Sequence, residues 1–327
     1  MKNKFLTFLI IYFISSGLSL AEKFKFESSN IEIVNNGNKI FAQNGKAFTA
    51  NNELEIYSEK FEYIKDKNIL KASGKGRAFI KSENLEIEFD SAIFDQKKSI
   101  IEANTNVKIL QLEKKLMIES DLMILNQNNL IIESSGNVKI YPLDKKFLIE
   151  TNSIQLNKKS NLISSNTKTN VKDIKNNIYK ADTFIYEIDK NILKLENVNF
   201  IDSEKNKFST SIAYVNTKTN NLFGKDVKVS LNNKSFDQNN EPRLKANSII
   251  NDEGISELTK GIFTTCKRRD GCPPWQLSAE KIQHDKKKQI INYKNALLKI
   301  YDIPVMYFPK FFHPDPTVER KSGFLVP

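Results

Sequence analysis

Hydrophobic and polar residues alternate one by one along most of this chain. Strict alternation occurs at residues 85–89, 138–140 and 227–231. A period of two places one set of side chains on a buried face and the other set in water, as in a β-strand that is covered on one side. Polar turns such as 66–68 and 126–129 separate the apolar runs. The pattern therefore predicts strands joined by tight turns, with no helix outside the N-terminal segment.

The strands recur in a larger unit of about thirty residues, a period typical of stacked arrays. Each unit opens on a short segment of similar character and closes on an alternating run. The openings begin at Ser58, Ser91, Ser120, Thr151, Ala181 and Ser211. In such an array each unit buries its apolar face against its neighbours. We therefore predict an all-β array, either a β-solenoid or an open roll, with two or more strands in each unit.

Composition does not decide what occupies the interior of such a roll. Its own side chains can fill it, or it can stay open to an apolar guest. A shift of one residue in the register would turn every inward side chain outward. On the register read here, the residues expected to face the interior are Leu85, Ile87, Phe89, Val107, Ile109, Val138, Ile140, Phe184 and Tyr186.

The N-terminus has the three parts of a secretory signal peptide. Lys2 and Lys4 supply a positive start, residues 5–13 supply an apolar core, and Ser19-Leu20-Ala21 supplies the small residues that signal peptidase requires. A transmembrane anchor is the alternative, but the apolar run is shorter than the roughly 20 residues that a bilayer span needs. The pattern favours cleavage after Ala21.

The charge of the chain and its lack of known catalytic motifs exclude several classes of function. The formal net charge is +11, yet nearly all of the positive charge is lysine, scattered beside acidic residues, so no patch for nucleic acid is expected. Hydrolase, P-loop and metalloprotease signatures are lacking, and the chain has only 2 histidines. We therefore expect neither an enzyme nor a cofactor.

Cys266 and Cys272 are the only cysteines, and they lie close together beside Gly271 and Pro273. In an oxidising compartment this arrangement favours a local disulfide, which by the loop-entropy argument would be worth about 2 kcal/mol. A zinc site that also used His284 and His313 would have spacings unlike those of known zinc motifs. No metal is expected.

Three motifs in the C-terminal part carry a resemblance. They are Thr264-Thr265-Cys266 followed by 273–276 (Pro-Pro-Trp-Gln), the run 304–309 (Pro-Val-Met-Tyr-Phe-Pro), and 320–325 (Arg-Lys-Ser-Gly-Phe-Leu). Together with the repeats, they resemble the outer-membrane lipopolysaccharide-assembly family LptD, also called the organic solvent tolerance protein. The repeats alone resemble the OstA-like domain that this family shares with LptA, the periplasmic bridge protein.

The resemblance implies a stacked β-jellyroll in the periplasm, associated with the outer membrane. It would receive lipopolysaccharide from a bridge protein of the LptA type, docked by edge-strand addition, and pass it toward a barrel plugged by a lipoprotein. The interior residues named above would line the lipid groove. The resemblance also offers a second disulfide pattern, in which these cysteines bridge to the barrel. A self-filled structural scaffold without lipid cargo remains the alternative.

The expected division of the chain follows. Residues 1–21 are a signal peptide, 22–231 the periplasmic jellyroll, 232–242 an Asn-rich linker, and 243–327 a C-terminal β segment that leads toward a barrel which this chain lacks. That end is compatible with a fragment, a truncated gene product or half of a split protein. The plug lipoprotein would bind only if a barrel is supplied elsewhere.

Aromatic side chains near the end are expected either to pack in the core or to meet the membrane interface: Tyr301, Tyr307, Phe308, Phe311 and Phe312.

Overall fold

The computed structural model describes residues 24–174, 177–201, 205–232, 240–252, 254–268, 273–314 and 318. In this part of the chain the strands form one 21-stranded sheet, which confirms the all-β prediction. None of the described segments is a helix that is long and apolar enough to cross a membrane. The predicted signal peptide, most of the predicted linker and the 320–325 motif lie outside the described residues.

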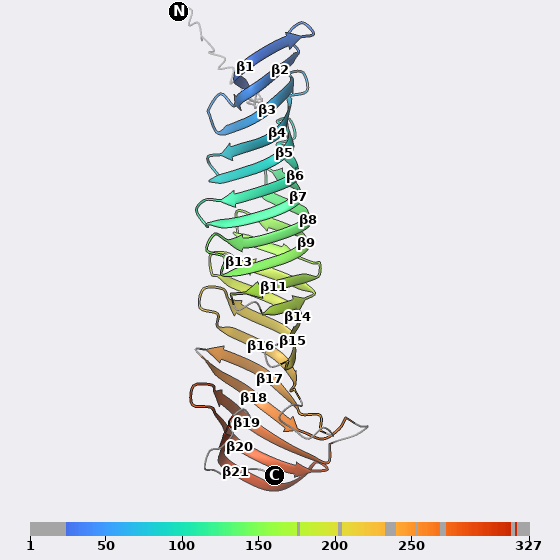
Figure 1. Cartoon of the computed structure of the whole chain (residues 1–327), viewed down its shortest axis with the longest axis vertical. Helices are drawn as coiled ribbons and strands as arrows, with labels where there is room; N and C mark the ends of the chain where they lie inside the picture. The colour runs from blue at the N-terminus through green and yellow to red at the C-terminus, as the bar shows by residue number, and fades with distance from the viewer. Residues whose placement is uncertain are drawn as a thin grey trace, which may run out of the picture.

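The strands run in chain order down a long column, with the N-terminal strand at one end and the C-terminal strand at the other (Figure 1). Their bounds are β1 (Lys25–Val34), β2 (Lys39–Phe48), β3 (Leu54–Ile64), β4 (Ile69–Ile80), β5 (Leu85–Asp95), β6 (Ile100–Gln111), β7 (Leu116–Asn126), β8 (Ile131–Pro142), β9 (Phe147–Asn157), β10 (Leu162–Ser165), β11 (Thr169–Asp173), β12 (Ile178–Ala181), β13 (Thr183–Glu187), β14 (Ile192–Ile201), β15 (Lys207–Asn216), β16 (Leu222–Ser230), β17 (Arg243–Asp252), β18 (Ile255–Thr264), β19 (Trp275–Asp285), β20 (Ile290–Ile300) and β21 (Ile303–Pro314).

The topology is an antiparallel meander, in which each strand pairs with the strand before it and the strand after it. The pattern is interrupted once. Strand β9 pairs with both β10 and β11, and β14 pairs with both β12 and β13, because two long strands are each broken into two short ones. Consecutive antiparallel strands need only tight turns between them, which is why turn residues recur so regularly in the sequence.

The turns stack in two rows, one at each end of the strands. On one side the Lys65 amide donates to the Asn38 carbonyl at 2.9 Å, and on the other side the Leu112 amide donates to the Asn84 carbonyl at 3.0 Å. Each bond joins a turn to the next turn in its own row. One step along a row comprises two strands and two turns, which explains the sequence unit of about thirty residues.

A bulge interrupts the pairing near the middle of the strands. Register shifts lie, for example, between Ser73 and Gly76, and between Ser135 and Val138. At the second of these bulges Gly136 has a φ of 77° and Asn137 a φ of 48°, values that glycine and asparagine tolerate best. Each bulge bends its strand, so that one strand contributes to two facing layers.

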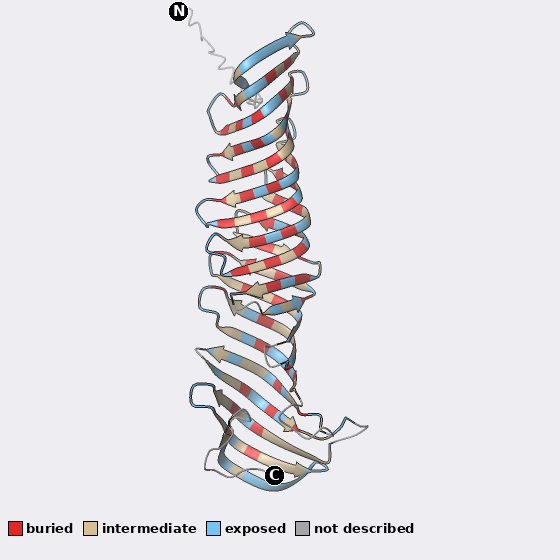
Figure 2. Cartoon of the chain, in the orientation of Figure 1, coloured by how far each residue is buried: buried red, intermediate tan, exposed pale blue. Residues whose placement is uncertain are grey.

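The core lies between these two layers, and its buried residues form bands along the column (Figure 2). A first cluster extends from Phe24 to Ala213, and a second extends from Val227 to Ala296. The pairing register aligns apolar residues across many strands. One such row consists of Ile56, Ala78, Ile87, Ile109, Ile118, Ile140 and Ile149. The alternation in the sequence thus becomes a continuous apolar interior.

The sheet continues past the predicted linker. Strand β16 pairs with β17 along most of its length, from Leu222 with Asn251 to Ser230 with Arg243. The second core cluster also begins on β16, at Val227. Residues 233–239 lie outside the described part of the chain, and the domain boundaries stay a prediction.

Replacing Gly45 with alanine is expected to release β1 from the rest of the sheet. A Cβ atom at Gly45 would lie 2.2 Å from the Glu27 carbonyl oxygen and 2.5 Å from the Ser28 Cα. These are main-chain atoms of the neighbouring strand, so they can move only if the pairing opens. Amide hydrogen exchange in β1 should become at least about tenfold faster.

Gly37 offers the matched control, because a Cβ there meets nothing within 4 Å and its φ of +83° suits asparagine. Exchange in β1 that stays slow in Gly45→Ala, or that rises equally in Gly37→Asn, would contradict the prediction.

Candidate functional site: the apolar interior and its seam

The residues predicted to face the interior all do so. Each of them belongs to the first core cluster and is between 0% and 4% exposed. They lie on four strands: Leu85, Ile87 and Phe89 on β5, Val107 and Ile109 on β6, Val138 and Ile140 on β8, and Phe184 and Tyr186 on β13. The register read from the alternation therefore agrees with the structure. Contact of these residues with a lipid stays a prediction.

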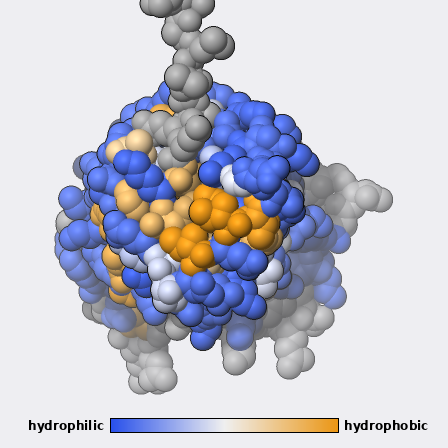
Figure 3. All heavy atoms as spheres, turned by 90° about the horizontal axis from the view of Figure 1, so that it is seen from above, coloured by the Kyte–Doolittle hydropathy of each residue, from blue (hydrophilic) through white to orange (hydrophobic). Residues whose placement is uncertain are grey.

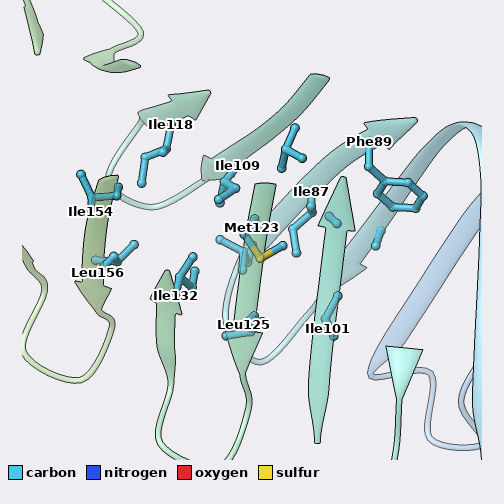
Figure 4. Packing of buried hydrophobic residues seen from close by; sticks show 14 of the residues in the cluster. Ile87, Phe89, Ile101, Ile109, Ile118, Met123, Leu125, Ile132, Ile154 and Leu156 are labelled. Atoms are coloured by element: carbon cyan, nitrogen blue, oxygen red, sulfur yellow. The ribbon is translucent and has the colours of Figure 1, made fainter. Parts of the chain in front are cut away.

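The side chains of the two layers point toward one another and fill the space between them (Figure 4). Ile87, Ile109 and Ile118 come from one layer, and Leu125 and Ile132 come from the other, and each is at most 1% exposed. Within β5 the bend brings the rings of Phe89 and Phe94 to 6.1 Å of each other. In this state the interior is occupied by the protein itself, so a guest requires the layers to separate.

Opposite the bend, the two rows of turns meet along a line that we call the seam. Here the Lys158 Nζ lies 3.3 Å from a carboxylate oxygen of Glu83 and also donates to the main-chain carbonyl of Glu83. Further along, Lys114 donates to the Asp189 carboxylate at 2.6 Å. Glu83 and Lys114 belong to one row of turns, while Lys158 and Asp189 belong to the other. These ion pairs therefore join the two layers.

Both ion pairs link residues that are 75 positions apart in the sequence, so the rows meet with a constant stagger. The two pairs differ in burial. The side chain of Lys158 is only 11% exposed, whereas that of Asp189 is 53% exposed. An exposed pair contributes at most about 1 kcal/mol, but breaking a shielded pair leaves a charge poorly solvated. The Lys158–Glu83 pair is thus the stronger of these two ion pairs across the seam.

An aromatic contact also crosses between the layers. The rings of Phe147, at the start of β9, and Tyr186, near the end of β13, lie 5.6 Å apart in an edge-to-face arrangement. The Tyr186 hydroxyl lies 3.4 Å from the Thr217 Oγ1, and burial raises the pKa of this tyrosine. Hydrogen bonds from Lys114 and Asn161 lower the pKa of Asp189, which keeps the seam carboxylate ionised.

The two ends of the column are formed by β1 and β21. In the described part of the chain, β1 pairs only with β2, and β21 pairs only with β20. Viewed along the column from the β1 end, apolar atoms gather near the centre within a hydrophilic rim (Figure 3). Unpaired edge strands present N–H and C=O groups that can extend the sheet with another chain.

The aromatic residues near the C-terminus divide between the two expected roles. Phe308 and Phe311 pack against the second core cluster, with ring centroids 5.3 Å apart. Tyr301, Tyr307 and Phe312 are 57%, 56% and 59% exposed. A role at a membrane interface stays a prediction for the exposed members of the group.

The structure describes only one of the two cysteines. The Cys266 thiol lies 3.8 Å from the Trp275 carbonyl oxygen, and the Cys266 carbonyl accepts a hydrogen bond from Arg243. Cys272 lies outside the described residues, so the disulfide stays a prediction. Among the described residues, no group of three or more His, Cys, Asp or Glu side chains could hold a metal ion.

The sequence pattern did not indicate the seam residues Glu83, Lys114, Lys158 and Asp189. Each lies in a polar turn, and turns of the same composition recur along the whole chain. The sequence signal for these residues is complementary charge at a separation of 75 residues. It identifies an ion pair only when the offset between the two rows of turns is known.

Taken together, these features define a class of protein: an elongated antiparallel β-roll whose first core cluster, from Phe24 to Ala213, forms an apolar interior with a bend along one edge and a polar seam along the other. Among proteins of known sequence, the chain is similar to LPS-assembly protein LptD from several bacteria. It is 32% identical over 103 residues to LptD of Nitrosococcus oceani, covering 31% of this chain and 14% of that protein. For LptD of Vibrio cholerae the identity is 29% over 150 residues, covering 45% and 18%.

LptD of Shewanella frigidimarina is 43% identical over 70 residues, which cover 21% of this chain and 9% of the relative. These similarities confirm the resemblance to LptD, although each spans less than a fifth of the relative's length. No family model matches the chain. Among solved structures, LptH of Pseudomonas aeruginosa, described as the LptA homologous periplasmic component of a lipopolysaccharide transport device, shares 14% identity at a TM-score of 0.32, covering 38% of this chain and 97% of LptH.

Proposed function

We propose that this protein is a lipopolysaccharide transport module, in which acyl chains move along the apolar interior of the roll. The observation that carries the proposal is the continuous apolar interior between two layers that are joined by a bend on one edge and by a seam on the other. The similarity to LptD over parts of the chain supports lipopolysaccharide as the cargo. The module would act without a chemical step, as a conduit and not as an enzyme.

Loading would require the two layers to part along the seam. At the bend, the continuous backbone of each strand connects the two layers. At the seam, the layers are held together by side-chain interactions such as Lys158–Glu83 and Phe147–Tyr186. Acyl chains that enter would cover the apolar side chains that the parting layers expose, which stabilises the loaded state by about 25 cal/mol per Å² of apolar surface buried. Hydrophobic burial of this kind is non-directional, so it holds a chain without fixing its position.

The ends of the column would connect the module to its partners. An LptA-type bridge protein would add a strand to the open edge of β1, and lipid would enter the interior from that end. At the other end, β21 would face an outer-membrane barrel, and a plug lipoprotein would bind only where that barrel is present. In this arrangement the module would lie in the periplasm, associated with the outer membrane.

A photocrosslinking amino acid at Ile87 or Ile140 is expected to capture lipopolysaccharide in cells. Both side chains are 0% exposed and lie between the layers, so a lipid that reaches them has entered the interior. Lys139 supplies the control, because it neighbours Ile140 but points outward and is exposed. Equal capture at Lys139 and Ile140, or no capture at either interior position in a folded protein, would count against the proposal.

A structural scaffold with a self-filled core is the second candidate function. The observation in its favour is the close packing of the interior, where the groove candidates are at most 4% exposed. The same crosslinking experiment separates the candidates, because a scaffold would retain its fold and yield no lipid adduct at any interior position.

A further inference from the structure

One polar side chain is buried in the apolar interior close to the seam. Gln111 is the last residue of β6 and continues the inward alternation of Val107 and Ile109. It is 3% exposed. In the pairing register it lies between Leu85 on β5 and Leu116 on β7, each of them buried and apolar. Gln111 thus interrupts a row of aliphatic side chains.

Neither the Oε1 nor the Nε2 of Gln111 has a hydrogen-bond partner among the described residues. A buried amide without partners is destabilising, because both of its polar atoms have lost water and gained nothing in return. A methionine of similar length would fill the same space without that penalty. The position is therefore poorly suited to a core that serves only to pack.

Gln111 lies between the two ion pairs of the seam. Its neighbour Leu85 follows Glu83 by two positions, and its other neighbour Leu116 follows Lys114 by two positions. A molecule that passed between the turns at this part of the seam would meet the Gln111 amide before it reached the aliphatic rows behind it.

We propose that Gln111 binds the polar linkages of the lipid, the amide, ester and hydroxyl groups that join acyl chains to a sugar headgroup, as the chains cross the seam. This inference deepens the proposed function and rests on it. A carboxamide carries two N–H donors and an acceptor oxygen, so it can both donate to and accept from an amide or a hydroxyl, and it can donate to an ester. Binding would satisfy the atoms that the closed roll leaves without partners.

The substitution Gln111→Met tests the proposal, because it removes the amide and keeps the length of the side chain. Two diazirine-labelled probes are titrated into the full chain: lipid A, whose acyl chains are joined by amide and ester linkages, and an alkane, which has no such linkages. We expect lipid A to bind the variant about tenfold more weakly, with binding of the alkane unchanged. The thermal midpoint of unfolding should rise, since the buried unsatisfied amide is gone.

Gln155→Met provides the control, because Gln155 is exposed on the outer face of β9, where its side chain donates to Glu133 at 3.3 Å. It should change neither titration. Equal binding of lipid A by wild type and Gln111→Met, or an equal loss for both probes, would overturn the role of Gln111 alone. Failure of the wild-type protein to bind lipid A at all would overturn the proposed function, and this inference with it.

Discussion

Tethering position 83 to position 158 is expected to stop lipid from entering the roll. Glu83 and Lys158 lie in opposite rows of turns and are joined across the seam at 3.3 Å. In a Glu83→Cys/Lys158→Cys variant, a short bismaleimide would hold the two layers together while leaving both layers intact. Because the interior is already filled, a roll that cannot part has no room for an acyl chain. Capture of lipopolysaccharide at Ile140 should fall at least about tenfold, a change worth about 1.4 kcal/mol.

The chemistry of the tether needs two precautions. Lysine and glutamate have long side chains, so a direct disulfide between cysteines at these positions is poorly matched in length, and a bismaleimide is the better bridge. The native cysteines should be replaced by serine, as Cys266→Ser and Cys272→Ser, to keep the linker away from them. Without the linker, the double variant should take up lipid at least as well as wild type, because the stronger of the two ion pairs across the seam has been removed.

A tether within one row of turns is the matched control. The Asn84 Nδ2 lies 2.7 Å from a carboxylate oxygen of Glu113, and both residues belong to the row that contains Glu83. Linking cysteines at these positions with the same reagent leaves the seam free, so loading should be unchanged. If the seam-linked protein loads as well as this control, lipid does not enter by separation of the layers.

Shortening Ile109 to alanine should cause a large loss of stability. Ile109 is 0% exposed and pairs in register with Ile87 and Ile118, which are equally buried. Removing its outer methyl and methylene groups leaves a cavity in a close-packed region, at a cost of about 2–5 kcal/mol. Chemical denaturation of the full chain, followed by circular dichroism, measures the change.

Lys108 lies next to Ile109 on the outer face of β6 and is exposed. Lys108→Ala should change the free energy of unfolding by no more than about 0.5 kcal/mol. A larger loss for Lys108→Ala than for Ile109→Ala would show that the strand is turned the other way, since a register shift of one residue exchanges the two faces.

Local patterns were enough to predict the strands, the repeated unit and the inward face. Alternation is a property of neighbouring residues, and the inward direction of Ile87, Ile109 and Ile140 follows from it wherever one face of a sheet is covered. The same alternation directs Gln111 inward, although its side chain is polar. The resemblance to LptD also rested on short motifs that could be read directly.

The bulges were harder to predict than the strands. Gly136 and Asn137 are residue types that are common in turns, yet they lie within β8, where they form a bulge. A bulge and a turn use the same left-handed backbone, so the sequence signal for the two is the same. Only the pairing with β7 and β9 distinguishes a bend inside a strand from the end of one.

The sequence by itself thus determined the all-β array, its repeat and the set of side chains that face inward. Only the tertiary structure decided that the interior is filled and that Glu83 meets Lys158 across the seam. The physical reason is one of range. The direction of a side chain follows from the backbone geometry of a few residues. Closure of the roll depends instead on the twist of each strand and the bend of each bulge, summed over the 75 residues that separate the partners.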